Sequence, residues 1–317
     1  MMVYKTFLHT VQTTLQERLG ANYTILVQKI PKNNGTDLDG LCISKSKDRV
    51  APTIYLNAYF EHYQDGIPLD QIIDELIELY TCDTRLPQID PELLAHFDRL
   101  RDKIAYKLIH TKSNEALLTD LPHIPYMDLS IVFYLFLEEN EYGHMTVLIH
   151  HSHLKAWGST IEELYALAKD NTPRLLPISL KNMLDVLKGI AKDHLGDDYR
   201  EEFVNELISP DDQSPLYVLS NTSGLNGACA ILYEHQLKSF ADLLEQDLVI
   251  LPSSIHEVLL VPYEEELCFE ELASMVQHIN QTEVPKADQL SNQIYYYSRT
   301  KDQVSLVQNL PKSSHLS

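Results

Sequence analysis

The sequence predicts an α+β fold built mostly from antiparallel hairpins with flanking helices. Several segments repeat apolar residues every three or four positions, as on one face of a helix, and others are short apolar runs bounded by turn residues, as in strands. The strand-like runs come in pairs joined by few residues, which favours antiparallel hairpins. The chain has 317 residues, 44% of them hydrophobic, so it can bury a large core. Its length is typical of about two domains.

Residues 1–90 form the first predicted unit. Apolar side chains four apart over residues 4–19 share one face of a helix, and Gly20 ends that helix. The Asn-Asn-Gly signal at 33–35 is typical of a turn between two strands. The predicted strands of this unit are 23–30, 38–44 and 52–56, and its second helix is 69–79.

Residues 91–178 form the second predicted unit. Its first helix is predicted over 93–108. The run 129–137 is apolar at nearly every position, which predicts a strand buried on both faces. Ser159 or Thr160 can cap a following helix. The remaining predicted elements are a hairpin loop over 138–143, a strand over 145–149 and a helix over 161–168.

Residues 179–300 form the third predicted unit, and residues 301–317 a loosely ordered tail. Apolar spacing from Ser179 to Ile190 predicts a helix. A hairpin is predicted around the polar turn 220–227. The predicted strands are 216–219, 228–233, 248–252, 255–262 and 293–298, and the predicted helices are 235–246 and 267–279.

The three units resemble one another in outline. The apolar triplets 54–56, 147–149 and 231–233 each end a predicted hairpin, and an aromatic residue follows each within ten residues. Two interpretations stay open. The units are degenerate helix–hairpin–helix copies, or the alternation is coincidental.

The charge of the chain favours a protein partner. The net charge of −21, from 25 basic and 46 acidic residues, argues against direct binding to nucleic acid or to an anionic membrane. Two interpretations of the acidic surface stay open: it keeps the protein soluble, or it mimics DNA and binds a DNA-binding protein. The acidic residues are scattered rather than grouped in long blocks, which weakens the second interpretation.

Cysteine spacing and hydropathy predict a cytoplasmic protein without a cofactor. The cysteines lie far apart, so the closely spaced ligands of a structural zinc site are missing. The longest apolar run, 129–137, is shorter than the roughly 20 residues that a membrane span needs. Residues 1–6 lack the apolar core of a signal peptide. The sequence contains no Walker, Gly-x-Ser-x-Gly or dinucleotide-binding motif.

The histidine group at 150–153 is the strongest chemical candidate. If this segment continues the preceding strand, His151 and His153 point to the same face, where two imidazoles can bind zinc, iron or copper. A third ligand could come from His144, Glu138 or Glu139. The alternative is an exposed polar strand end that happens to contain histidines.

Two weaker candidates lie in the third unit. His256-Glu257 resembles the start of a His-Glu-x-x-His zinc motif, but Leu260 occupies the second histidine position and excludes it. His256 could still act as an acid or base. The turn 220–227 could present backbone N–H groups to an anion, although hairpin turns use the same residue types for geometry alone.

The segment 217–262, especially 219–221 and 251–258, resembles a family of bacterial proteins of unknown function from gut anaerobes. The segment 52–57 and the helix after it resemble that family too. Its members are often found near mobile elements, and no established activity comes with the resemblance. We therefore predict a non-catalytic, cytoplasmic protein-interaction module. The alternatives are a metal-binding protein or metal-dependent enzyme that uses His151 and His153, and an acidic mimic of DNA.

Overall fold

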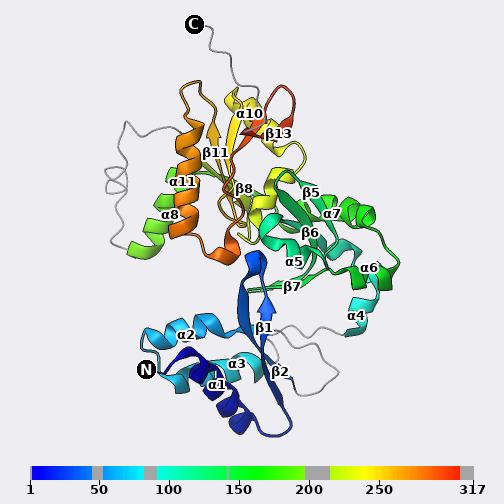
Figure 1. The fold of residues 1–317 in the computed structure, drawn as a ribbon, viewed down its shortest axis with the longest axis vertical. Helices are drawn as coiled ribbons and strands as arrows, with labels where there is room; N and C mark the ends of the chain where they lie inside the picture. The colour runs from blue at the N-terminus through cyan, green and yellow to red at the C-terminus, as the bar shows by residue number, and fades with distance from the viewer. Residues whose placement is uncertain (1, 45–52, 82–90, 141–142, 197–214, 308–317) are drawn as a thin grey trace.

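The computed structural model confirms the α+β class. Its strands form three sheets, one in each predicted unit, and the named strands pair antiparallel throughout the described part of the chain (Figure 1). The structure describes residues 2–44, 53–81, 91–140, 143–196 and 215–307.

The first sheet follows its prediction closely. It has the order β1-β2-β3, with β1 (Thr24–Pro31), β2 (Asp37–Ser44) and β3 (Thr53–Tyr55). Buried side chains of the helices pack on the sheet because each helix carries one apolar face. The helices are α1 (Tyr4–Leu19), α2 (Leu56–Gln64) and α3 (Leu69–Thr81).

The second sheet corrects one predicted helix. Its four strands are β4 (Ile104–His110), β5 (His123–Tyr126), β6 (Leu129–Asn140) and β7 (Gly143–Leu148). The helix predicted over 93–108 is wrong. Its first part forms α4 (Pro91–Ala95) and the short 3-10 helices η2 (Phe97–Arg99) and η3 (Arg101–Lys103), and its last part lies in β4. Buried residues occupy both faces of β4, as in a strand covered on both sides.

Two helices follow the second sheet. They are α6 (His151–Trp157) and α7 (Ile161–Leu175), and α7 packs on β4. Thr160 caps α7 as predicted, because its hydroxyl accepts the Glu163 N–H at 3.2 Å. The loop predicted over 138–143 begins later than expected, since β6 continues through Asn140.

The third sheet has six strands in the order β13-β12-β10-β11-β9-β8. Its helices are α8 (Met183–Leu195), α10 (Gln236–Leu244) and α11 (Phe269–Thr282). The strands are β8 (Ile178–Asn182), β9 (Tyr217–Asn221), β10 (Leu248–Leu251), β11 (Val258–Pro262), β12 (Tyr295–Ser298) and β13 (Gln303–Leu306).

Three predictions in this region are wrong. Residues 179–182 lie in β8 rather than in a helix, and residues 303–306 of the predicted tail form β13. The strand predicted over 228–233 is a 3-10 helix, η7 (Gly227–Leu232). Since β8 and β11 occupy both edges of β9, no edge of β9 remains for a returning strand. The third helix–hairpin–helix copy is therefore absent from the described residues, and the boundaries 1–90, 91–178 and 179–300 stay a prediction.

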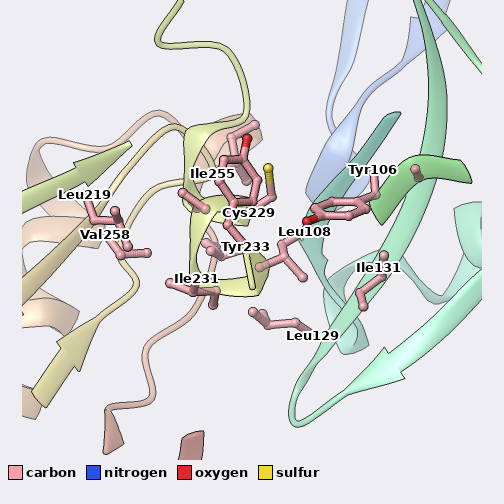
Figure 2. Packing of buried hydrophobic residues seen from close by; sticks show 14 of the residues in the cluster. Tyr106, Leu108, Leu129, Ile131, Leu219, Cys229, Ile231, Tyr233, Ile255 and Val258 are labelled. Carbon is pink, nitrogen blue, oxygen red and sulfur yellow. The ribbon is translucent and has the colours of Figure 1, made fainter. Parts of the chain in front are cut away.

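The 3-10 helix η7 joins the second and third sheets into one core. Cys229 and its neighbours Ala228 and Ala230 are fully buried. Figure 2 shows Tyr106 and Leu108 of β4 facing η7, and Leu219 and Val258 of the third sheet on the other side. Small residues allow the backbone of η7 to approach both sheets closely. Burial of this apolar surface is the main stabilising contribution of the junction.

Gly227 gives a direct test of this close packing. A Cβ atom there would lie 2.0 Å from the Ser220 hydroxyl oxygen and 2.3 Å from the His256 carbonyl oxygen. We expect Gly227→Ala to lower the free energy of unfolding by about 2 kcal/mol or more, since an overpacked site must shift its backbone. Chemical denaturation measures the change.

Gly189→Ala is the matched control. Gly189 lies within α8, and a Cβ atom there would meet nothing within 4 Å. Alanine favours a helix interior over glycine by about 0.5–1 kcal/mol, so this variant should be slightly more stable than the wild type. Equal effects of the two substitutions would contradict the packing described for η7.

Candidate functional site

The tip of the β1–β2 hairpin meets both other sheets. Figure 1 shows this hairpin extending from the N-terminal helices toward the rest of the molecule. At the tip, the 3-10 helix η1 (Asn33–Gly35) contacts η4 (Lys112–Asn114) of the second unit and η8 (Lys286–Asp288) of the third. Side chains that are distant in sequence therefore come together at one junction.

Asn34 holds this junction together. Its backbone is left-handed, with φ 59° and ψ 32°, a conformation that asparagine tolerates better than most residues. Its backbone N–H donates to the Asn114 Oδ1 at 2.7 Å, and its own Oδ1 accepts from the Asn114 Nδ2 at 2.9 Å. Its Nδ2 donates to the carbonyl oxygens of Lys286 and Gln289 at 2.8 and 2.7 Å. One buried amide thus links all three units.

Charged side chains surround the tip. Lys32 precedes η1, and its ammonium lies 4.1 Å from the centre of the Tyr55 ring. Lys107, on β4, is partly buried. The pKa of Lys107 is lowered to about 8, mostly by burial and in part by the positive charge of Lys32, while Asp288 opposes the shift. This cluster joins a lysine from each of the first two units to a carboxylate of the third.

His256 adds an imidazole to the cluster. Its Nδ1 lies 3.0 Å from the Gly224 carbonyl oxygen, and its Nε2 lies 3.6 Å from the Asp288 Oδ1. The nearby carboxylate of Asp288 raises the pKa of His256, and burial opposes that rise. Acceptors next to both ring nitrogens favour the imidazolium form. His256 is therefore better suited to carry a positive charge than to accept a proton.

The loop 220–227 lies against His256, and several of its N–H groups are already hydrogen-bonded. The Ser223 N–H donates to the Asn221 Oδ1 at 3.1 Å, and the Leu225 N–H donates to the Ser223 hydroxyl at 3.2 Å. The Ser220 hydroxyl donates to the His256 carbonyl oxygen at 2.7 Å. These contacts give the loop a structural role in placing His256. An anion bound by the loop's backbone stays a prediction.

His151 and His153 lie on the helix α6 rather than on a strand. Residues two apart on a helix differ by about 200° in direction, so the expectation of a shared strand face is wrong. The His153 Nδ1 accepts the backbone N–H of His150 at 3.0 Å, and its ring stacks on Trp157. Burial lowers the pKa of His153, as does the nearby His150. His151 is exposed.

The suggested third metal ligands lie on the β6–β7 hairpin. Glu139 pairs with His144 there, and the His144 Nδ1 lies 3.5 Å from the Glu139 Oε1. Within the described ranges, no three His, Cys, Asp or Glu side chains form a group that could hold a metal ion. Metal binding by His151 and His153 stays an untested alternative.

Sequence reasoning missed Lys32, Lys107 and Asp288. One signal could have identified Lys107: it is the single charged residue within the apolar run 104–109. A lysine in a strand covered on both faces needs an explanation, because its ammonium loses hydration. Lys32 and Asp288 carry no comparable local signal.

The fold and this junction define an α+β protein whose charged side chains converge where three sheets meet. Residues 4–299 match the model of a family described as Family of unknown function (DUF5688), and the chain belongs to that family. Comparison with curated proteins found no match, and neither did comparison with solved structures. Among the described helices, none is both long and apolar enough to cross a membrane.

Substitutions of Asn34 test its role at the junction. We expect Asn34→Ala to lower the free energy of unfolding by about 3 kcal/mol, because it leaves buried polar groups unpaired and strains a left-handed backbone. Asn34→Gly removes the same side-chain hydrogen bonds, but glycine adopts the left-handed backbone without strain. It should therefore be about 1 kcal/mol less destabilising than Asn34→Ala. Denaturation curves measure both. If both variants stay within 0.5 kcal/mol of the wild type (roughly the error of such differences), Asn34 does not hold the units together.

The pairing of His256 with Asp288 predicts a pH dependence. The folded state raises the pKa of His256 above its ordinary value of 6.5, so its stabilisation is fully present below that value and is lost as pH rises through the folded pKa. We expect wild type to exceed His256→Gln in stability at pH 5.5, by less than about 1 kcal/mol at this partly exposed site. The difference should shrink by pH 8.5.

Thermal unfolding at both pH values measures this difference. His9→Gln is the control, because His9 is an exposed residue of α1 whose side chain makes no ion pair with the described residues. A difference between wild type and His256→Gln that grows with pH would contradict the assignment.

Proposed function

We propose that this protein acts without catalysis, by binding another protein through the outer face of α8. One observation carries the proposal. Helix α8 has no fully buried residue, although its sequence is amphipathic. Helices with an apolar stripe normally bury it, so a stripe left open is typical of an interaction surface.

Three large apolar side chains of α8 are open to solvent. Leu187 is 41% exposed, Ile190 51% and Leu195 48%. At 100° per residue, they lie on one side of the helix, within an arc of about 140°. Figure 1 places α8 at the outside of the third unit, away from the tip of the β1–β2 hairpin. The surface on α8 is therefore separate from the charged junction.

The charge of the protein suggests the chemistry of the partner. A net charge of −21 attracts a basic surface and speeds its association. The expected partner is a protein with an apolar groove or helix face and a basic rim. The alternative prediction stays open: the acidic surface mimics DNA, and the partner is a DNA-binding protein. The bacterial and cytoplasmic setting is part of the proposal too.

A photo-crosslinking residue at Ile190 tests the proposal in cells that make the protein. We expect a discrete adduct with a second protein, lost at least fivefold when Leu187→Ser is added, because a polar group then interrupts the apolar contact. The matched control places the same crosslinker at Lys192, about 200° round the helix from position 190, and should give no such adduct. A melting curve of the Leu187→Ser variant checks that it folds.

Three outcomes would refute the proposal. They are no adduct from position 190, an adduct only with a second copy of this chain, and crosslinks only within the chain. Equal amounts of adduct from positions 190 and 192 would show that the contact is not confined to the apolar face of α8. That result would also count against the proposal.

A further inference from the structure

The chain contains two Asn-Gly pairs, Asn34-Gly35 and Asn226-Gly227. Asparagine deamidates most readily before glycine, because the glycine backbone nitrogen attacks the side-chain carbonyl carbon and no Cβ atom hinders its approach. Both asparagines are buried, and both have a left-handed backbone. Each pair lies where units of the protein meet, so deamidation there would change how the units are held together.

The docked hairpin tip engages the Asn34 amide on all sides. Its Oδ1 accepts from the Asn114 Nδ2 at 2.9 Å, and its Nδ2 donates to the carbonyl oxygens of Lys286 and Gln289 at 2.8 and 2.7 Å. Attack by the Gly35 nitrogen moves the carbonyl carbon and expels the nitrogen that makes the last two bonds. These contacts must break before the reaction proceeds, so docking protects the Asn34-Gly35 pair.

Hydrogen bonds rather than apolar packing hold the tip in place. Among the described residues, the apolar cluster of the first unit contains no residue of the other two units, and their clusters contain none of the first. Hydrogen bonds at the tip replace bonds to water, so each adds little net stability. Withdrawing the tip therefore costs less than unfolding the core of the first unit or the core of the other two, which is the condition for local opening.

The pair Asn226-Gly227 is protected more deeply. Asn226 precedes η7, where Ala228 and Cys229 are fully buried in the core that the second and third sheets share. A Cβ atom at Gly227 would lie 2.0 Å from the Ser220 hydroxyl oxygen, so the surroundings are tightly packed. Exposing this pair opens apolar surface to water, which is the more costly change.

We propose that Asn34 is a deamidation site that reacts when the hairpin tip withdraws, and that its product keeps the tip from docking again. The Gly35 nitrogen forms a bond to the Asn34 Cγ, its proton passes to the departing nitrogen, and ammonia leaves. Water then hydrolyses the succinimide to aspartate or isoaspartate. The reaction is an irreversible release of the first unit from the junction, and it does not depend on the surface of α8.

The product cannot repeat the contacts of the amide. In aspartate, an oxygen replaces the nitrogen that donates to the carbonyl oxygens of Lys286 and Gln289. A carboxylate oxygen is an acceptor only, so attraction becomes repulsion, and a buried charge lacks its partners. Isoaspartate also lengthens the backbone by a methylene group. Both products therefore disfavour the docked tip.

Peptide mapping by mass spectrometry measures deamidation of both pairs in the full chain during incubation at mildly alkaline pH. In the urea-denatured chain, the two pairs should react at similar rates, because the dipeptide is the same. In the folded wild type, Asn34 should react more slowly than in urea, but about tenfold or more faster than Asn226, because only the tip opens locally. Asn226 is thus the matched control within the same molecule.

Asn114→Ala tests the opening step. It removes both side-chain contacts to Asn34, so deamidation of Asn34 should become about fivefold or more faster, while Asn226 reacts as in the wild type. Ser152→Ala, at an exposed position of α6, should leave both rates unchanged.

Asn34→Asp tests the effect of the product on docking. The position-34 backbone N–H donates to the Asn114 Oδ1 in the docked tip, so its hydrogen exchange reports withdrawal. Exchange there should be about tenfold or more faster in Asn34→Asp than in the wild type. Asn34→Gly loses the same side-chain bonds without adding a charge and should exchange more slowly than Asn34→Asp.

Four results would overturn the proposal. They are equal rates for Asn34 and Asn226 in the folded chain, an Asn34 rate as high in the folded chain as in urea, no effect of Asn114→Ala on that rate, and wild-type exchange in Asn34→Asp. If Asn114→Ala does not fold, the comparison of Asn34 with Asn226 in the wild type decides.

Discussion

The amide of Asn34 is the contact on which the arrangement of the three sheets depends. It pairs with Asn114, 80 residues away, and with carbonyl groups more than 250 residues away. The Asn34 and Asn114 side chains are buried, so their amide groups would be unsatisfied if the hairpin tip were withdrawn. The tip can occupy the junction only with a left-handed residue at position 34, and asparagine supplies both that backbone and the hydrogen-bonding groups.

A second contact joins the other two units beside the first. The carboxylate of Asp128, at the turn between β5 and β6, accepts hydrogen bonds from the Ser291 and Tyr295 hydroxyl groups at 2.6 and 2.7 Å. Apolar packing of η7 against β4 supplies the larger contribution to stability. Hydrogen bonds are directional, whereas apolar burial is not, so the polar contacts specify how the packed units are oriented.

The local pattern of apolar residues predicted most helices and strands. It failed for segments that are buried on both sides. The helix over 4–19 and the strand over 129–137 have clear periodicity or a long apolar run, and both are confirmed. In 104–109 and 228–233, apolar or small residues occupy nearly every position, so periodicity cannot separate helix from strand. The junction was beyond prediction because it joins residues of three distant segments. Of its cluster, the sequence indicated His256 and the loop 220–227, but not their contact.

Burial shifts the pKa of most of the titratable groups in the core and junction. Burial raises the pKa of the Cys229 thiol to about 12, so it carries almost no nucleophilic thiolate at neutral pH. Burial also raises the pKa of the Tyr106 phenol, and Asp288 favours the charged form of His256. Lys107 is the one of these four groups whose pKa is lowered, chiefly by burial.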